Sequence, residues 1–319
     1  MVCMRIVVVA GGIGGARFLT GVRSAAPGAD ITAVVNTGDD VTLHGLRICP
    51  DLDSVMYTLG DGIDPERGWG RRGESWVVKD ELAAYGAEPT WFGLGDRDLA
   101  THLVRTRMLD AGYPLSEVTL ALAERWQPGV TLLPMSDQRV ETHVVVTDPD
   151  TGRPQAIHFQ EWWIRHRAAL DPSAFVQVGV EDARPAPGVV EAFAAADAVL
   201  LAPSNPVVSV GTVLGVPGLR EALLASPARV VGVSPVVGGA PVRGMADRCL
   251  PAIGVEVSAE GVGRHYGARS AGGLLDSWLV HETDVSDVPG VDVRRVPLLM
   301  TDPATTQAMA EAALNAARA

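Results

Sequence analysis

Four glycines within five positions follow an apolar run at the start of the chain. The run covers residues 5–10, and the glycines are Gly11, Gly12, Gly14 and Gly15. Glycine allows positive φ angles and a close approach of the backbone to a ligand, and free N–H groups at the start of a following helix attract phosphate. The layout therefore predicts a strand that leads into a phosphate-binding turn.

This glycine turn departs from two common nucleotide motifs. It lacks the Gly-Lys-Ser/Thr ending of a Walker A loop. Arg17 stands where a dinucleotide-binding turn carries its third glycine, and the second predicted strand ends in Asn36 instead of an acidic residue for the ribose hydroxyls. The turn thus favours phosphate binding in general and leaves an NAD-binding oxidoreductase as a weaker alternative.

Four aspartates follow the second predicted strand. Asp39 and Asp40 are adjacent, and Asp51 and Asp53 come a little further along the chain. Carboxylates from two loops, together with substrate phosphates, are frequent ligands of Mg²⁺. Each residue also has a structural alternative, because Asp39 can bond its own turn and Asp53 can cap the helix that follows it. The spacing makes Mg²⁺ a candidate cofactor and leaves its ligands open.

Further polar residues are placed where they could contact a ligand. Some follow later apolar runs, and others stand at the start of a predicted helix. Ser204 and Asn205 lie between two prolines, and Ser234 ends a further apolar run. If these runs are parallel neighbours in a sheet, their loops meet at one edge, where they could bind phosphate or only turn the chain. Asp96 suits a helix cap, and Arg97 could bind a phosphate or form a surface salt bridge.

Composition narrows the class of protein. The chain has 319 residues, is 47% hydrophobic and carries a net charge of −12, which argues against a broad nucleic-acid-binding surface. Its 3 cysteines form no C-x-x-C pattern, so neither a disulfide framework nor a zinc site is indicated. We see no signal peptide and no apolar run long enough to cross a membrane, which takes about 20 residues. We expect a cytoplasmic protein with no nucleic-acid or membrane partner.

Short apolar runs alternate with helical patterns, which predicts an α/β fold with a Rossmann-like, three-layer parallel-sheet core. We expect strands near residues 5–10, 31–36, 130–134, 176–180, 198–202, 229–234, 277–281 and 295–299. Residues 63–126 read as a small, mainly helical insertion, and residues 1–62 and 127–319 as the nucleotide-binding core. A β-hairpin is predicted at about residues 139–160, around a turn rich in Pro, Asp and Gly.

Seven ordered motifs together resemble one family, the 2-phospho-L-lactate transferases (CofD, called FbiA in actinobacteria, where the members are of the phosphoenolpyruvate transferase type). The resemblance extends over nearly the whole chain. The motifs are Gly11-Gly-Ile-Gly-Gly15, Asn36-Thr-Gly-Asp-Asp40, Pro50-Asp-Leu-Asp53, Leu94-Gly-Asp-Arg-Asp98 with Ala100-Thr-His102, His158-Phe-Gln160, Ala202-Pro-Ser-Asn-Pro206 and Ser234-Pro-Val-Val-Gly238.

The resemblance implies an enzyme of coenzyme F-420 biosynthesis. Such an enzyme transfers the enolpyruvyl-phosphate or 2-phospholactyl group from a guanosine-diphosphate-activated donor to the ribityl hydroxyl of the deazaflavin Fo and releases GMP. Direct in-line attack would need positioning and charge neutralisation more than covalent help. The resemblance also implies Mg²⁺ and a homodimer. The actinobacterial character of the motifs favours the enolpyruvyl donor.

The family also implies roles for the candidate residues. Asp40 and Asp53 would bind Mg²⁺ and serve as catalytic residues, and Asp53, Arg97 and Asp96 would contact Fo. The nucleotide would be held by the glycine turn and the polar loops, that is by Gly11, Gly12, Gly14, Gly15, Asn36, Asp39, Ser204, Asn205 and Ser234.

A nucleotide-sugar-binding regulatory protein of the same superfamily is the alternative to the transferase. Such regulators share a similar glycine turn, but we expect them to lack the pairing of Pro50-Asp-Leu-Asp53 with Leu94-Gly-Asp-Arg-Asp98. The presence of both segments in this chain therefore favours the enzyme.

Overall fold

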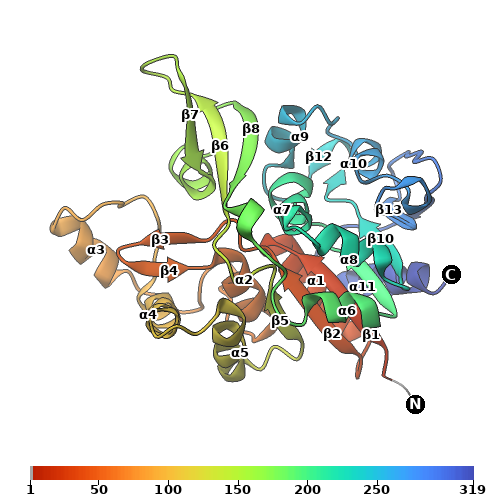
Figure 1. The fold of residues 1–319 in the computed structure, drawn as a ribbon, viewed down its shortest axis with the longest axis horizontal. Coiled ribbons are helices and arrows are strands. Elements are labelled where there is room, and N and C mark those ends of the chain that lie inside the picture. The colour runs from red at the N-terminus through yellow and green to blue at the C-terminus, as the bar shows by residue number, and fades with distance from the viewer. Residues whose placement is uncertain (1–2) are drawn as a thin grey trace.

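A central parallel sheet organises the molecule, as the computed structural model of residues 3–319 shows (Figure 1). Its seven strands lie in the order β14-β13-β10-β9-β1-β2-β5, and every pairing is parallel. The predicted α/β class with a Rossmann-like core is confirmed. The strands are β1 Arg5–Ala10, β2 Asp30–Val35, β5 Thr131–Pro134, β9 Ala198–Leu201, β10 Arg229–Val233, β13 Ser277–His281 and β14 Asp292–Val296.

The strand order reverses between β1 and β9. From β1 the chain adds β2 and β5 on one side, and it then returns to the other side of β1 with β9, β10, β13 and β14. In open parallel sheets ligands bind outside the carboxyl ends of the strands at such a switch point. The glycine turn follows β1 and Ser204 follows β9, so the two flank the switch point where a ligand is expected.

Helices cover both faces of the sheet, which is why the strands are apolar on both sides. Ile6 and Val8 of β1 pack into one core cluster, whereas Val7 and Val9 pack into the other. The first cluster is covered by α1 Gly12–Ala25, α2 Pro50–Leu59 and α11 Pro303–Ala317, and the second by α6 Val189–Ala195, α7 Gly211–Gly215, α8 Leu219–Ala225 and α10 Ala259–Tyr266.

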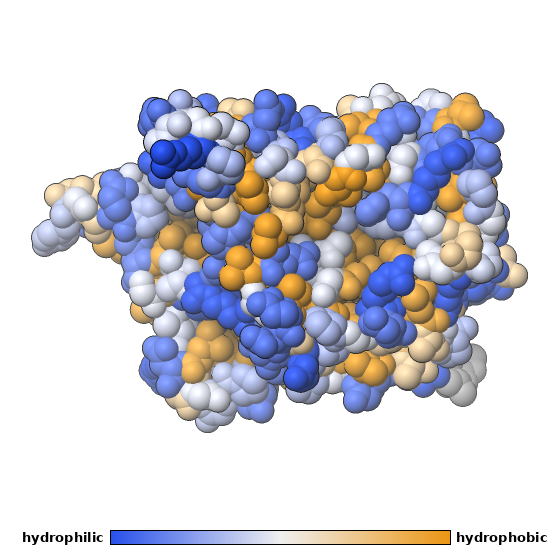
Figure 2. Space-filling model, turned by 45° about the horizontal axis from the view of Figure 1, so that its top comes forward, coloured by the Kyte–Doolittle hydropathy of each residue, from blue (hydrophilic) through white to orange (hydrophobic). Residues whose placement is uncertain are grey.

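A second, antiparallel sheet of three strands stands beside the core. It consists of β6 Glu141–Thr147, β7 Pro154–His158 and β8 Pro172–Val178, in the order β7-β6-β8. The predicted hairpin is therefore confirmed. Its tip projects from the molecule in Figure 1, and hydrophilic residues gather at the corresponding upper left of the view in Figure 2. The prediction that residues near 176–180 join the parallel sheet was wrong. Val176 and Val178 suggested a buried strand, but their side chains are 45% and 50% exposed because one face of β8 meets solvent.

Two smaller features also differ from expectation. The last strand of the parallel sheet lies about three residues earlier than predicted, at Asp292–Val296. A short hairpin, β3 Val41–Leu43 with β4 Leu46–Ile48, was not predicted because each strand is only three residues long. This hairpin carries the chain from Asp40 to the start of α2.

Residues 63–126 carry three helices: α3 Val77–Ala84, α4 Asp96–Asp110 and α5 Leu115–Trp126. The division into a core and an insertion stays a prediction. The remaining elements are the π-helices η1 Glu161–Arg165 and η3 Pro206–Val210, the 3-10 helices η2 Val180–Asp182 and η4 Arg269–Ala271, the strands β11 Val236–Val237 and β12 Ala240–Pro241, and α9 Ala246–Ala252.

Within residues 3–319 no single helix has both the length and the apolar run that a membrane crossing needs. Two short helical stretches, Pro206–Gly215 and Leu219–Ala225, meet those criteria only when taken together, and they are bent by 86° relative to each other.

We predict that the contact between α1 and α11 depends on the missing side chain of Gly21. A Cβ at this position would lie 2.4 Å from the backbone oxygen of Thr306. Alanine favours a helix by roughly 1 kcal/mol over glycine, yet Gly21→Ala should lower the free energy of unfolding by about 1–3 kcal/mol, as measured by urea denaturation. The control Ser24→Ala, at an exposed position of the same helix, should change it by less than about 0.5 kcal/mol. Equal stability of the two variants would contradict the prediction.

Candidate active site

The glycine turn after β1 is fixed against the loop after β9. Gly12 has a φ of +63°, and a Cβ at Gly14 would lie 2.8 Å from the backbone oxygen of Pro203. Ser204 Oγ accepts a hydrogen bond from the Gly11 N–H at 3.1 Å and donates one to Gly11 O at 2.8 Å. The predicted ligand Ser204 thus holds the shape of the turn, and it brings the two sides of the switch point together.

Asn36 ties three loops of the site to one another. Its Nδ2 donates to Asp51 Oδ2 at 2.9 Å and to the backbone oxygen of Val208 at 3.2 Å, while its Oδ1 accepts from the Gly38 N–H at 2.9 Å. The side chain is fully buried. Asn36 therefore joins the loop after β2 to the start of α2 and to η3, and its position depends on all three.

Asp51 lies next to the glycine turn, and two further buried carboxylates, Asp39 and Asp40, lie close enough to act on its charge. Burial raises the pKa of Asp40 to about 6 against the opposing charge of Arg47, and burial raises the pKa of Asp51 to about 6 against its hydrogen bond from Asn36. Burial and then the charge of Asp51 hold the pKa of Asp39 well above its usual range. Negative charge at this edge of the sheet is therefore only partly neutralised by the protein.

Two of these carboxylates keep an oxygen without a hydrogen-bond partner. Among residues 3–319, nothing donates a hydrogen bond to Oδ1 of Asp39 or to Oδ1 of Asp40, although both atoms are buried. The other oxygen of Asp40 accepts from Arg47 at 3.0 Å. Buried oxygens in this state suit a hard divalent cation such as Mg²⁺, because the cation removes both the like-charge repulsion and the missing bonds.

Asp53, the second predicted metal ligand, is engaged differently. Arg105 on α4 binds both of its oxygens, with 3.0 Å between Nη1 and Oδ2 and a second, short contact between Nη2 and Oδ1. Both side chains are almost fully buried. Burial lowers the pKa of Arg105, but Asp53 and, to a lesser extent, Cys49 and Tyr57 together raise it above its usual range. Each oxygen of Asp53 therefore already accepts a hydrogen bond from Arg105, and the predicted metal role of Asp53 stays a prediction.

The Asp53–Arg105 pair continues into a polar row along α4. His102 Nδ1 lies 3.7 Å from Asp53 Oδ2, and His102 Nε2 lies 3.4 Å from Asp98 Oδ2. Tyr57 donates to Asp98 Oδ1 at 2.6 Å. Asp53, Asp98 and His102 lie close enough to share a metal ion, but Arg105 and Tyr57 already bind the two carboxylates. We therefore interpret this row mainly as a polar connection that holds α2 against α4.

The other predicted site residues have structural partners of their own. Asn205 Oδ1 caps η3 by accepting from the N–H groups of Val207 and Val208, and Ser234 Oγ bonds the backbone of Val236. The carboxylate of Asp96 accepts from Ser75 and from the first N–H groups of α3. Arg97 is exposed, and among residues 3–319 its guanidinium forms no salt bridge, so it is available to a ligand.

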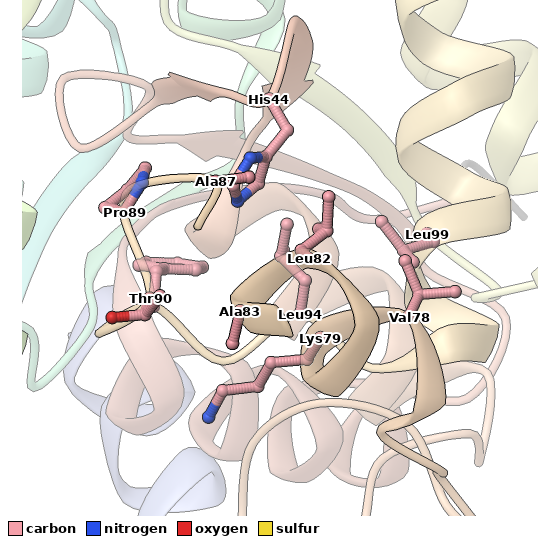
Figure 3. A pocket seen from close by; sticks show the side chains of 11 residues that line it. His44, Val78, Lys79, Leu82, Ala83, Ala87, Pro89, Thr90, Leu94 and Leu99 are labelled. Atoms are coloured by element: carbon pink, nitrogen blue, oxygen red, sulfur yellow. The ribbon is translucent and has the colours of Figure 1, made fainter. Parts of the chain in front are cut away.

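Two hollows on the surface lie away from this site. One, between α3 and the β3–β4 hairpin, is lined by His44, Lys79 and apolar side chains (Figure 3), and its volume of about 10 Å³ holds no more than a water molecule. Another, of about 250 Å³, lies between α7 and α10 and is lined by residues such as Leu214 and His265. Neither includes any of the predicted site residues.

Sequence reasoning missed Arg105 and Arg47, which neutralise Asp53 and Asp40. One signal was present: Asp98, His102 and Arg105 recur every three or four residues and so share one face of a helix. The spacing shows a polar face on α4, but it does not reveal that Asp53 on α2 lies opposite.

The chain is similar to known proteins over nearly its whole length. A sequence model of the 2-phospho-L-lactate transferase CofD family matches residues 6–292. The chain is 65% identical over 314 residues to a phosphoenolpyruvate transferase of Nocardia farcinica, covering 98% of this chain and 95% of the relative. It is 60% identical over 323 residues to a phosphoenolpyruvate transferase of Mycolicibacterium smegmatis, covering 98% and 99% of the two chains.

The fold is also similar to a solved structure. A Bacillus halodurans protein of the UPF0052 family superposes with a TM-score of 0.63 at 19% sequence identity, over 98% of this chain and 100% of the other. At this identity the similarity concerns the fold alone. The family match and the relatives, which extend over nearly the whole chain, decide the assignment. The chain belongs to the 2-phospho-L-lactate transferase family and is an enzyme that transfers a substituted phosphate group.

Proposed function

We propose that this enzyme transfers the enolpyruvyl-phosphate group, or less favourably the 2-phospholactyl group, from a guanosine-diphosphate-activated donor to the ribityl hydroxyl of Fo. GMP is the leaving group, and the product belongs to coenzyme F-420 biosynthesis. The names of the Nocardia and Mycolicibacterium relatives favour the enolpyruvyl donor. The observation that carries the proposal is the pair of buried carboxylates with free oxygens, Asp39 and Asp40, which follow β2 and act electrostatically on Asp51 at the glycine turn.

Mg²⁺ fits the carboxylates of Asp39 and Asp40, which have the buried, unpartnered oxygens. When bound, the ion would neutralise charge on the diphosphate of the donor. Asp53 was predicted as the second ligand, but Arg105 binds both of its oxygens. We therefore propose that Asp53 acts mainly by holding Arg105, which places a fixed positive charge near Asp40.

The glycine turn would bind the guanosine diphosphate portion of the donor through its backbone N–H groups at the start of α1. Ser204, Asn205, Asn36 and Ser234 would contribute by shaping the surrounding loops, because their side chains already bond the backbone there. Preorganised donors of this kind stabilise the charge that develops on a phosphate without needing to move.

Arg97 is our candidate contact for Fo, since its guanidinium is exposed and unpaired among residues 3–319. Its backbone is fixed on both sides, because its N–H donates to Glu74 and its carbonyl accepts from Arg71 Nη1. Asp96 would support this contact indirectly by joining the start of α4 to the start of α3. We also propose that the enzyme is a cytoplasmic homodimer and that it has no nucleic-acid or membrane partner. Its net charge of −12 supports the absence of a nucleic-acid partner.

The direct test offers the purified protein Fo, Mg²⁺ and each of the two guanosine donors, and follows GMP release together with product mass. We expect GMP to appear in step with the product, and faster with the enolpyruvyl donor. Omission of Fo is the control, and it should abolish GMP release because the proposed attack is direct. If neither donor releases GMP in the complete mixture, the proposed reaction is wrong.

Stability should depend on pH through the buried carboxylates. The pKa values of Asp40 and Asp51, both about 6, lie above the ordinary 3.8, so their protonated forms favour folding. The metal-free protein should therefore lose stability as the pH rises from about 4 through 6, by on the order of 1.4 kcal/mol per pKa unit. Thermal unfolding across this range measures the effect. Mg²⁺ should stabilise the protein most above pH 6, where the carboxylates are ionised.

The variant Asp39→Asn tests the same cluster. It removes the group whose ionisation repels Asp51, so the metal-free variant should lose less stability than the parent as the pH rises, while the Mg²⁺-induced rise in melting temperature should disappear. Asp150→Asn, at the exposed hairpin tip, is the matched control and should change neither quantity. An undiminished response of Asp39→Asn to Mg²⁺ would show that the ion binds elsewhere.

The pair of Asp53 and Arg105 should behave as one unit in a double-mutant cycle. Asp53→Ala leaves the buried guanidinium unpaired and should lower the free energy of unfolding by about 3–5 kcal/mol. Adding Arg105→Met should restore a large part of that loss without restoring turnover. Arg165→Met, which breaks the exposed Glu161–Arg165 pair, should lose less than about 1 kcal/mol. Strict additivity of the two buried substitutions in urea unfolding would refute the coupling.

A further inference from the structure

The antiparallel sheet holds the backbone of the loop that carries Asp39 and Asp40. Three consecutive peptide carbonyls of this loop each face a donor that lies more than 100 positions away in the chain, in β6, at the end of β7 or just after β7. The contacts are Thr142 N to Gly38 O at 2.7 Å, Gln160 Nε2 to Asp39 O at 3.3 Å and His158 Nε2 to Asp40 O at 3.2 Å.

The partners of His158 decide which ring nitrogen carries the proton. Its Nδ1 lies 3.1 Å from the Gln160 N–H, which can only donate, and its Nε2 faces the carbonyl of Asp40, which can only accept. The ring must therefore be neutral, with its proton on Nε2. Both nitrogens are occupied within the protein, so His158 has no nitrogen left to bind substrate or to exchange a proton with it.

Gln160 is even more enclosed than His158, with a side chain that is 6% exposed. Its amide donates to the carbonyl of Asp39, which lies between the two carbonyls that Thr142 and His158 bind. The loop is also bonded internally, because the Gly38 N–H donates to Asn36 Oδ1 and the Asp40 N–H donates to Thr37 O. The carbonyls thus face the sheet, while the free carboxylate oxygens of Asp39 and Asp40 make no bond to it.

We propose that His158 and Gln160 are positioning residues for the transfer reaction. They fix the peptide groups of Asp39 and Asp40 so that both carboxylates are presented to the ligand in one geometry, and they do not themselves touch the substrate. The inference rests on the proposed function insofar as Asp39 and Asp40 hold the cation. It also explains a feature of the fold: the antiparallel sheet serves as the support of one loop of the site.

A matched pair of variants separates this role from simple packing. The amide of glutamine reaches the position of the imidazole Nε2, whereas that of asparagine reaches only the position of Nδ1. His158→Gln therefore keeps the donor to Asp40 O, and His158→Asn keeps the acceptor for the Gln160 N–H but loses the donor. The two side chains differ by one methylene and share their functional group.

Two readouts do not require turnover. Hydrogen exchange of the Gly38 and Asp40 amides in the metal-free protein measures how firmly the loop is held. The Mg²⁺ concentration that produces half of the rise in melting temperature measures how well the carboxylates are presented. We expect His158→Asn to speed exchange at these amides by about 2–10-fold and to raise the Mg²⁺ midpoint by about 10-fold or more. His158→Gln should stay within about 3-fold of the parent in both.

The steady-state parameters complete the test where GMP release is observed. His158→Asn should lower kcat/KM by about 10–100-fold, and His158→Gln should restore most of it. Phe175→Leu is the control for packing, because Phe175 on β8 packs against Trp162 of η1 and its apolar side chain supplies none of the three donors to the loop. It should lower the melting temperature and leave the Mg²⁺ midpoint unchanged.

Equal losses in His158→Asn and His158→Gln, in proportion to their melting temperatures, would overturn the proposal. So would faster exchange in His158→Asn with an unchanged Mg²⁺ midpoint, since the loop would then be looser without consequence for the carboxylates. Absence of GMP release by the parent protein refutes the proposed reaction instead, and in that case the exchange and Mg²⁺ measurements still decide whether His158 positions the loop.

Discussion

The burial of four aspartates at one edge of the parallel sheet is the constraint on which the rest of the site depends. Each buried carboxylate is unfavourable unless it is paired or hydrogen-bonded. Among residues 3–319, the guanidinium groups that form salt bridges with these aspartates are those of Arg47 and Arg105 alone. Asp53 is fully paired, whereas Asp39 and Asp40 each retain an unpartnered oxygen. The protein thus neutralises Asp53, whereas Asp39 and Asp40 keep oxygens to which a cation can bind.

The surrounding polar residues make this arrangement possible by holding loops in place. Asn36 joins three loops, Ser204 bonds both polar groups of Gly11, and Asn205 caps η3. Backbone groups at the site are thereby set before any ligand arrives, which is the condition under which hydrogen bonds to a developing charge are most effective. Several residues that look like ligands from their type and position therefore act through the backbone that they fix.

The sequence was sufficient for the fold class and for the loops of the site, because continuous apolar runs identify strands buried on both faces and the rule for switch points places their loops together. It was not sufficient to predict which side chains contact one another in the site. Arg105 and His158 lie far along the chain from Asp53 and Asp40, and only the folded arrangement brings them together. The error at β8 has a similar origin, since the type of a residue such as Val178 does not show which face of a strand meets solvent.

A site of this kind should be less stable alone than with its ligand. Like charges held close together in a buried site favour unfolding. A species that binds only the folded state stabilises it, by an amount that grows with its affinity. Protonation also relieves the repulsion, but a protonated carboxyl group no longer binds a cation. Protonation and cation binding therefore compete as ways of stabilising the folded protein. Firm support of the loop by Thr142, Gln160 and His158 is then a necessity, because an unsupported loop would relieve the repulsion by moving Asp39 and Asp40 apart.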